Sequence, residues 1–107
     1  QTGRFGEMAM IEISIVPVGT PTPSVSQYVA RAVQVLQGEK DIKYELTAMG
    51  TIIEGDLERL LALAGKMHQS AFGAGAMRVV TTVKIDERRD KPLTIDSKVG
   101  AVKRIIK

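Results

Sequence analysis

The chain has 107 residues, of which 44% are hydrophobic and 25% are charged, values close to the average for a globular domain. This length predicts one domain with one core and excludes two full domains. The sequence holds no cysteine, which excludes disulfides, thiolate metal sites, iron–sulfur clusters and a cysteine nucleophile. No apolar stretch approaches the ~20 residues that span a bilayer, and no signal-peptide pattern opens the chain. We therefore expect a cytoplasmic protein that does not insert into membranes.

The charge balance argues against nucleic acid as a partner. Fifteen basic residues oppose twelve acidic ones, and the two signs alternate along most of the chain. Basic residues are concentrated only near the end, a pattern typical of a solvated terminal helix. Aromatic residues make up 4% of the chain, so side chains that stack bases are scarce.

The first half of the chain predicts a strand followed by a helix. Residues 1–8 show no periodicity and are interpreted as a loose tail or a cloning remnant. Residues 9–18 alternate, with an apolar face formed by Ile11, Ile13 and Ile15. A proline-rich connection follows, and the Ser24/Gln27 spacing predicts a capping box for a helix over residues 25–37.

A hairpin and a second helix are predicted next. Residues 42–47 alternate, residues 51–54 form a second short β run, and Asp56 is a candidate N-cap. The helix after Asp56 carries an apolar stripe with helical spacing. This stripe consists of Leu57, Leu60, Leu61, Ala64, Met67 or His68, and Ala71.

The last third predicts one more strand and a tail helix. Residues 77–86 alternate, residues 87–93 form a loop, and a short C-terminal helix carries apolar residues up to Ile105 and Ile106. The order β-α-β-β-α-β favours an α+β, ferredoxin-like domain over residues 9–107. Such a domain has an antiparallel four-stranded sheet, with strand order 4-1-3-2, and two helices on one face.

One sheet face is left without helices in this arrangement. It mixes polar with apolar positions, which favours an interface or a pocket, although a solvated face is the ordinary alternative. The polar members are Glu12, Ser14, Arg78, Thr82 and Lys84, and the apolar ones Val16, Ile53 and Val80. Together with the apolar tail helix, this face predicts a homo-oligomer, either a dimer or a homotetramer.

The sequence gives little support for a catalytic function. The single histidine, His68, lies at the edge of an apolar helical stripe, where a packed imidazole is the ordinary interpretation. Without cysteine or a second histidine, no metal site is expected. No G-x-S-x-G motif is present, and no catalytic residue is nominated, so we expect a protein that is not an enzyme. An RNA-binding version of the fold would need aromatic residues on its central strands, and residues 9–18 and 51–54 contain none.

Four separated blocks carry a specific resemblance. They are residues 14–20 (SIVPVGT), 23–29 (PSVSQYV), 43–56 (KYELTAMGTIIEGD) and 78–91 (RVVTTVKIDERRDK). In this order they resemble the small thiamine-binding, YkoF-like family. The resemblance implies a ferredoxin-like fold that assembles through its sheets, and a non-catalytic pocket for thiamine or its hydroxymethylpyrimidine half, with no cofactor required.

A thiamine-like ligand needs hydrogen-bonding partners for its aminopyrimidine and a carboxylate or a π face for its thiazolium. Each candidate also has a structural interpretation, as a β-former, helix-start residue or surface acid. The candidates are Ser14, Ser26, Tyr44, Thr47, Thr51 and Glu54. The sequence thus predicts a binding protein in vitamin transport, salvage or sensing; the alternative is an oligomeric structural or regulatory module without a vitamin ligand.

Overall fold

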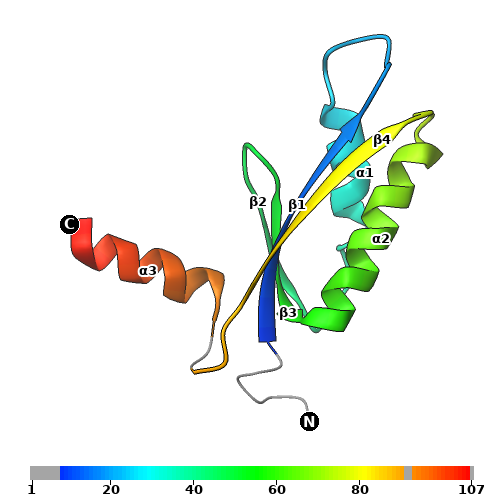
Figure 1. Ribbon diagram of the computed structural model, residues 1–107. Helices are drawn as coiled ribbons and strands as arrows, with labels where there is room; N and C mark the ends of the chain where they lie inside the picture. The colour runs from blue at the N-terminus through cyan, green and yellow to red at the C-terminus, as the bar shows by residue number, and fades with distance from the viewer. Residues whose placement is uncertain (1–7, 91–92, 107) are drawn as a thin grey trace.

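The computed structural model describes residues 8–90 and 93–106. Four strands and three helices follow one another in the predicted order (Figure 1). They are β1 (Met8–Pro17), α1 (Ser26–Gln34), β2 (Lys43–Leu46), β3 (Thr51–Asp56), α2 (Leu57–Gly73), β4 (Val79–Glu87) and α3 (Ile95–Ile106). Residues 1–7 of the predicted tail, and residues 91–92 of the predicted loop, lie outside the described residues, whereas Met8 begins β1.

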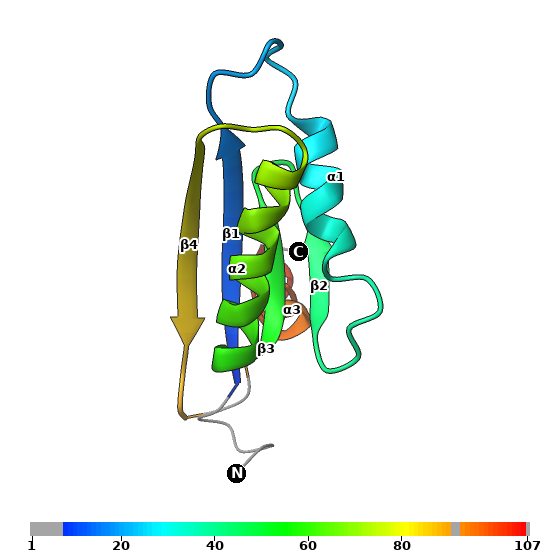
Figure 2. The ribbon, with the colours of Figure 1, turned by 90° about the vertical axis from the view of Figure 1, so that its right-hand side faces the viewer.

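The strands form one sheet in the order β2-β3-β1-β4, and all neighbouring strands are antiparallel. The predicted α+β, ferredoxin-like fold is therefore confirmed. Helices α1 and α2 lie together over one face of the sheet (Figure 2). The opposite face, which we call the open face, is approached by α3 alone (Figure 1).

The core lies between the sheet and the two covering helices. Alternation in β1 turns Ile11 and Ile13 toward the helices, where both are fully buried. Each such side chain stabilises the fold by about 1.5–3 kcal/mol relative to an exposed one. The helices contribute Tyr28, Ala32, Leu36, Leu60, Leu63, Ala64, Met67 and Ala71.

Ile53 was placed by the sequence on the open face, and this prediction is wrong. Its Cα partner in β1 is Ile11, so both side chains point toward the helices, and Ile53 is 0% exposed. Its neighbour Ile52, paired with Glu12, lies on the open face instead. Cross-strand pairing decides the face, because directly paired residues share one side of a sheet.

The predicted capping box at Ser24 is also wrong. Val25 is the N-cap of α1 and makes no side-chain cap, while the Ser24 hydroxyl hydrogen-bonds to that of Ser26. Helix α1 ends at Gln34, earlier than predicted, and the chain continues as turns. A reciprocal box occurs at α3, where Thr94 Oγ1 accepts from the Ser97 amide and Ser97 Oγ accepts from the Thr94 amide.

Helix α2 begins as predicted, since the Asp56 carboxylate accepts a hydrogen bond from the Arg59 amide at 3.2 Å. Its buried stripe contains Leu63 and omits Leu61, which is 43% exposed. Leu61 lies one residue, or about 100° of helical rotation, beyond Leu60. This rotation turns it away from the core.

Helix α3 stands away from the open face, fastened at its first turn (Figure 1). Leu93 and Ile95 are buried, whereas the apolar residues farther along the helix are exposed. These exposed residues are Val99, Val102, Ile105 and Ile106. The core therefore does not absorb the apolar residues of the tail helix.

Candidate functional site

Two adjoining cavities lie between α1 and the β2–β3 hairpin. The inner cavity has a volume of about 140 Å³ and the outer one about 630 Å³. Val25, Val29, Leu46, Thr47 and Ala48 line both of them. We refer to the two cavities together as the α1 groove.

The groove exists because β2 is short and α1 is displaced from it. Helix α1 packs against α2 and β1, and the four-residue β2 receives no close cover from it. Leu46, at the end of β2, therefore remains 55% exposed. Val25, Val29 and Val33 recur every four residues on α1 and form an apolar wall.

Three of the six predicted site residues line this groove, and a fourth borders it. Thr47 and Thr51 line the inner cavity, and Ser26 and Thr47 line the outer one. Ser14 borders the inner cavity, but it lies between the buried Ile13 and Ile15 on β1, so its side chain is directed to the open face. Thr51 is buried, at 4% exposure, at the floor. Among the described residues that line the two cavities, none carries a charge. The groove is thus apolar, with hydroxyl groups at its base.

The hydroxyl of Thr47 organises the β2–β3 turn. It donates to the Gly50 carbonyl at 2.8 Å and accepts from the amides of Met49 and Gly50 at 3.2 Å. A Cβ on Gly50 would lie 2.9 Å from the Ile13 carbonyl oxygen, so the turn also needs a glycine there. The rim of the groove is fixed by these contacts.

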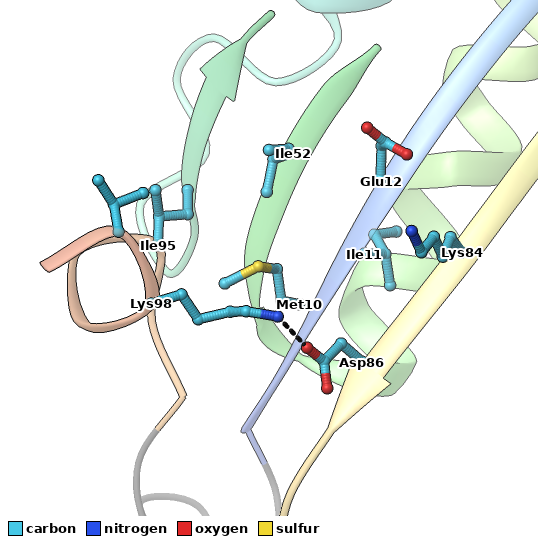
Figure 3. Close-up of a pocket in the computed structure, with 9 residues that line it drawn as sticks. Met10, Ile11, Glu12, Ile52, Lys84, Asp86, Ile95 and Lys98 are labelled. Carbon is cyan, nitrogen blue, oxygen red and sulfur yellow. Dashed lines mark hydrogen bonds and ion pairs between the residues drawn. The ribbon is translucent and has the colours of Figure 1, made fainter. Parts of the chain in front are cut away.

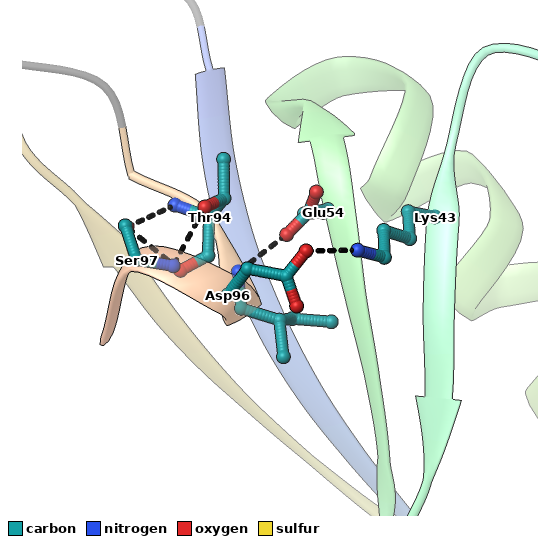
Figure 4. Close-up of polar contacts among 6 residues, drawn as sticks. Lys43, Glu54, Thr94, Asp96 and Ser97 are labelled. Atoms are coloured by element: carbon teal, nitrogen blue, oxygen red, sulfur yellow. Dashed lines mark hydrogen bonds and ion pairs between the residues drawn. The ribbon is translucent and has the colours of Figure 1, made fainter. Parts of the chain in front are cut away.

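Glu54 lies on the open face, on the opposite side of the sheet from the groove. Its carboxylate accepts a hydrogen bond from the Ile95 amide, at the start of α3 (Figure 4). Beside it, Lys43 Nζ lies 2.5 Å from the Asp96 carboxylate. This hydrogen bond raises the pKa of Lys43 above its ordinary value, with a smaller Coulombic contribution from Asp96.

Tyr44 is separated from the α1 groove and from the contacts of Glu54 and Lys43. It pairs with Ile53 across β2 and β3, so its side chain lies on the helix side of the outer strand, where it is exposed. It does not line either cavity of the α1 groove. The structure therefore brings Ser26, Thr47 and Thr51 together at the groove, directs Ser14 to the open face and leaves Tyr44 and Glu54 apart.

A further cavity of about 250 Å³ lies where α3 meets the open face (Figure 3). The Lys98 ammonium hydrogen-bonds to Asp86 at 2.6 Å across it, and Glu12 and Lys84 stand on neighbouring strands. The sequence analysis did not identify this cavity, because no local pattern relates α3 to β4.

The described part of the chain offers few groups for metal binding or catalysis. Within it, no three His, Cys, Asp or Glu side chains gather as a metal site, and no helix has the length and apolar character to cross a membrane. His68 Nδ1 lies 2.6 Å from Thr81 Oγ1, and its ring contacts Phe72 edge-on. This pair lines none of the cavities described above.

Known structures share this fold over nearly the whole chain. A hypothetical protein from Methanocaldococcus jannaschii is 40% identical, with a TM-score of 0.83, over 91% of this chain and 97% of that one. A Thermotoga maritima protein named for thiamine biosynthesis or salvage has a TM-score of 0.76 over 89% of this chain and 98% of its own. Its identity is 22%, so it supports the fold alone.

Sequence relatives identify the family. The UPF0045 protein YqgV of Bacillus subtilis is 47% identical over 98 residues, which cover 89% of this chain and 94% of the relative. The profile of the family described as thiamine-binding protein matches residues 11–103. The chain therefore belongs to the thiamine-binding protein family.

Proposed function

We propose that the protein is a non-catalytic binding protein for thiamine or its hydroxymethylpyrimidine moiety, acting in vitamin transport, salvage or sensing. The observation that carries this proposal is the α1 groove, an apolar cleft with no charge among its described lining residues, with Thr51 at its buried floor and Thr47 fixing its rim. An aminopyrimidine is a flat neutral ring with donors and acceptors on its edge, and hydroxyl groups serve as either partner. Family membership supports the same ligand class.

The two cavities suggest where the two parts of such a ligand lie. The inner cavity, at about 140 Å³, is smaller than the roughly 300 Å³ at which ordinary ligand pockets begin. We propose that the pyrimidine edge enters it, while the rest of the ligand lies in the outer cavity against Val29 and Val33. A second subunit would have to bring Glu54 to this ligand, since Glu54 lies on the other sheet face.

The residues present favour binding over turnover. The groove holds hydroxyl groups but, among the described residues that line it, no carboxylate or imidazole to act as a base. His68 is hydrogen-bonded to Thr81 outside the groove. These features support a protein that holds its ligand unchanged.

The alternative of an oligomeric module without a vitamin ligand rests on a different observation. Val16 and Val80 are exposed on the open face, and Val99 and Val102 are exposed on α3. Exposed apolar side chains at these two places are typical of interaction sites. We propose that copies of the chain assemble through this face as a dimer or tetramer, with or without ligand.

Calorimetric titration tests the binding proposal. Thiamine, its phosphates and hydroxymethylpyrimidine are each titrated into about 100 μM protein, where dissociation constants up to the millimolar range give measurable heat. We expect Thr51→Val to weaken binding about twofold to tenfold, the effect of one neutral hydrogen bond. Thr82→Val, which makes the same change on exposed β4, is the matched control and leaves the affinity unchanged.

Two results would contradict the proposal. Absence of heat with all of these compounds would favour the module without a vitamin ligand. Equal effects of Thr51→Val and Thr82→Val would show that binding occurs outside the groove.

A further inference from the structure

The cavity where α3 meets the open face contains one acidic and one basic side chain without a partner. Glu12 on β1 and Lys84 on β4 both line it, and they are paired directly across the two strands. Neither side chain makes a hydrogen bond or an ion pair with any described residue. The other two charged residues of the lining, Lys98 and Asp86, form an ion pair with each other at 2.6 Å (Figure 3). One carboxylate and one ammonium group are therefore left for a ligand.

The position of Glu12 explains why these two charges do not meet. A Cβ built on Gly50 would lie 3.3 Å from Glu12 Cγ, so the Glu12 side chain leans toward β3. Lys84 lies on the other side of β1, on the edge strand β4, where it is exposed. Glu12 itself is half-buried. A half-buried carboxylate without a donor is unfavourable, and a ligand ammonium group would supply the missing charged hydrogen bonds.

The rest of the cavity is lined by apolar side chains from three elements. Met10 comes from β1, Ile52 from β3, and Ile95 and Val99 from α3. The cavity volume of about 250 Å³ is below the roughly 300 Å³ at which ordinary ligand pockets begin, so the ligand must be small. A short aliphatic chain fits these walls, whereas a nucleotide is too large for them.

The charges of the cavity distinguish between classes of small ligand. An amine would satisfy Glu12 and leave Lys84 unpaired, and an anion would bind Lys84 but be repelled by Glu12. A zwitterion satisfies both groups. The ammonium and carboxylate groups of an α-amino acid are attached to one carbon atom, which suits two side chains whose Cβ atoms are only roughly 4.5–5.5 Å apart across paired strands. The lining therefore favours an amino acid with an apolar side chain.

We propose that the cavity beneath α3 binds a free aliphatic α-amino acid, such as leucine, and that the bound amino acid controls the position of α3. Its ammonium group binds Glu12, its carboxylate binds Lys84, and its side chain packs between Ile52 and Val99. Because Ile52 belongs to the sheet and Val99 to α3, the ligand holds the helix against the open face. A ligand that binds only the docked helix stabilises that position by mass action. The site lies on the opposite face of the sheet from the α1 groove, so it does not depend on thiamine binding.

Titration of leucine into the isotope-labelled full chain, followed by NMR, tests this proposal. We expect saturable shifts of the amides of Glu12, Lys84 and Val99 at leucine concentrations up to about 10 mM, and no shift at Val29 in the α1 groove. Three analogues lack one part of leucine each: isocaproate lacks the amino group, isoamylamine the carboxylate, and glycine the side chain. Each should bind at least tenfold more weakly. Absence of saturable shifts would overturn the proposal, and equal binding of isoamylamine would overturn the assignment of a zwitterion.

Substitution of Glu12 identifies the site. We expect Glu12→Gln to weaken leucine binding about tenfold to a hundredfold, the effect of losing a hydrogen bond to a charged group. Glu45→Gln is the matched control, because Glu45 also pairs with Ile52 on the open face but does not line the cavity. It should leave the affinity unchanged within about twofold, and circular dichroism checks that both variants are folded. Equal losses in the two variants would overturn the site.

Hydrogen exchange tests the coupling to α3. Leucine should slow exchange of the α3 amides in the wild type and in Glu45→Gln, and should not do so in Glu12→Gln at the same concentration. Exchange along α3 that is unchanged in the leucine-saturated wild type would overturn the control of the helix by the ligand. A protein that fails to bind thiamine can still give all the expected results, so the two proposals fail separately.

Discussion

Glu54 and Ile95 are joined by a hydrogen bond of 2.5 Å that spans 41 positions of sequence, from the Ile95 amide to the Glu54 carboxylate. The first amides of a helix lack partners within the helix, and a carboxylate is favoured at that end. Glu54 therefore fastens the start of α3 to β3. This anchoring role explains a carboxylate at this position without any ligand.

Replacing Glu54 by glutamine separates anchoring from ligand binding. Glutamine keeps an acceptor but removes the charge, so we expect a loss of about 1 kcal/mol, the difference between charged and neutral hydrogen bonds. Hydrogen exchange at the Ile95 amide should accelerate about fivefold. Thiamine titration of the same variant tests the predicted ligand contact. A tenfold weaker affinity with unchanged Ile95 exchange would assign Glu54 to the ligand.

Thr47 should be required for the shape of the α1 groove. Thr47→Val removes three hydrogen bonds at the β2–β3 turn, and we expect the free energy of unfolding to fall by about 1–2 kcal/mol. Thr47→Ser keeps the hydroxyl and should stay within about 0.5 kcal/mol of the wild type. Urea denaturation measures both. A Thr47→Val protein as stable as the wild type would contradict a structural role for the hydroxyl group.

Gly50 should tolerate no side chain. Gly50→Ala places a Cβ 2.9 Å from the Ile13 carbonyl oxygen, and we expect about 1–3 kcal/mol of destabilisation. Gly100→Ala in α3 is the control, because its Cβ would have only an ordinary contact with the end of Arg104. The control should gain up to about 1 kcal/mol from helix propensity. The thermal unfolding temperature should fall for Gly50→Ala and should not fall for Gly100→Ala.

The Lys43–Asp96 ion pair should be lost at alkaline pH. The folded pKa of Lys43 is raised above 10.5 by the Asp96 hydrogen bond, so its contribution is complete below that pH and is lost as the pH rises through the folded pKa. We expect Lys43→Met to open the first turn of α3 faster than in the wild type at pH 8, with no difference above the folded pKa. Backbone NMR of the Asp96 amide compares the two proteins. A difference that persists at high pH would exclude the charge as its cause.

The buried face of β1 and the order of strands and helices could be predicted from the sequence, because both follow from the spacing of apolar residues along the chain. The face of β1 follows directly from Ile11, Ile13 and Ile15. The face of Ile53 does not, since β3 offers apolar residues at both Ile52 and Ile53, and only the pairing with β1 distinguishes them. Ser24 has the residue type of a cap, but the backbone places Val25 at the cap position.

The candidate site was predictable only in part. Hydroxyl residues around the β2–β3 turn, such as Thr47 and Thr51, were identified by type, and the fold gathers them at the inner cavity. The apolar wall of α1 carries no separate signal in the sequence, because Val29 and Val33 follow the same helical spacing as the buried Tyr28, Ala32 and Leu36. The Glu54–Ile95 contact depends on where α3 turns back to the sheet, which no local pattern encodes.

The way α3 is attached has a consequence for the dynamics of the protein. Its buried contacts are confined to Leu93 and Ile95, and its other attachments are hydrogen bonds and ion pairs at exposed side chains. Local opening costs little where few apolar contacts are lost. In an isolated subunit, the amides of α3 beyond its first turn should exchange as a separate unit, well before those of α2. Slow exchange along this helix in the native assembly would then report directly on contact with another chain.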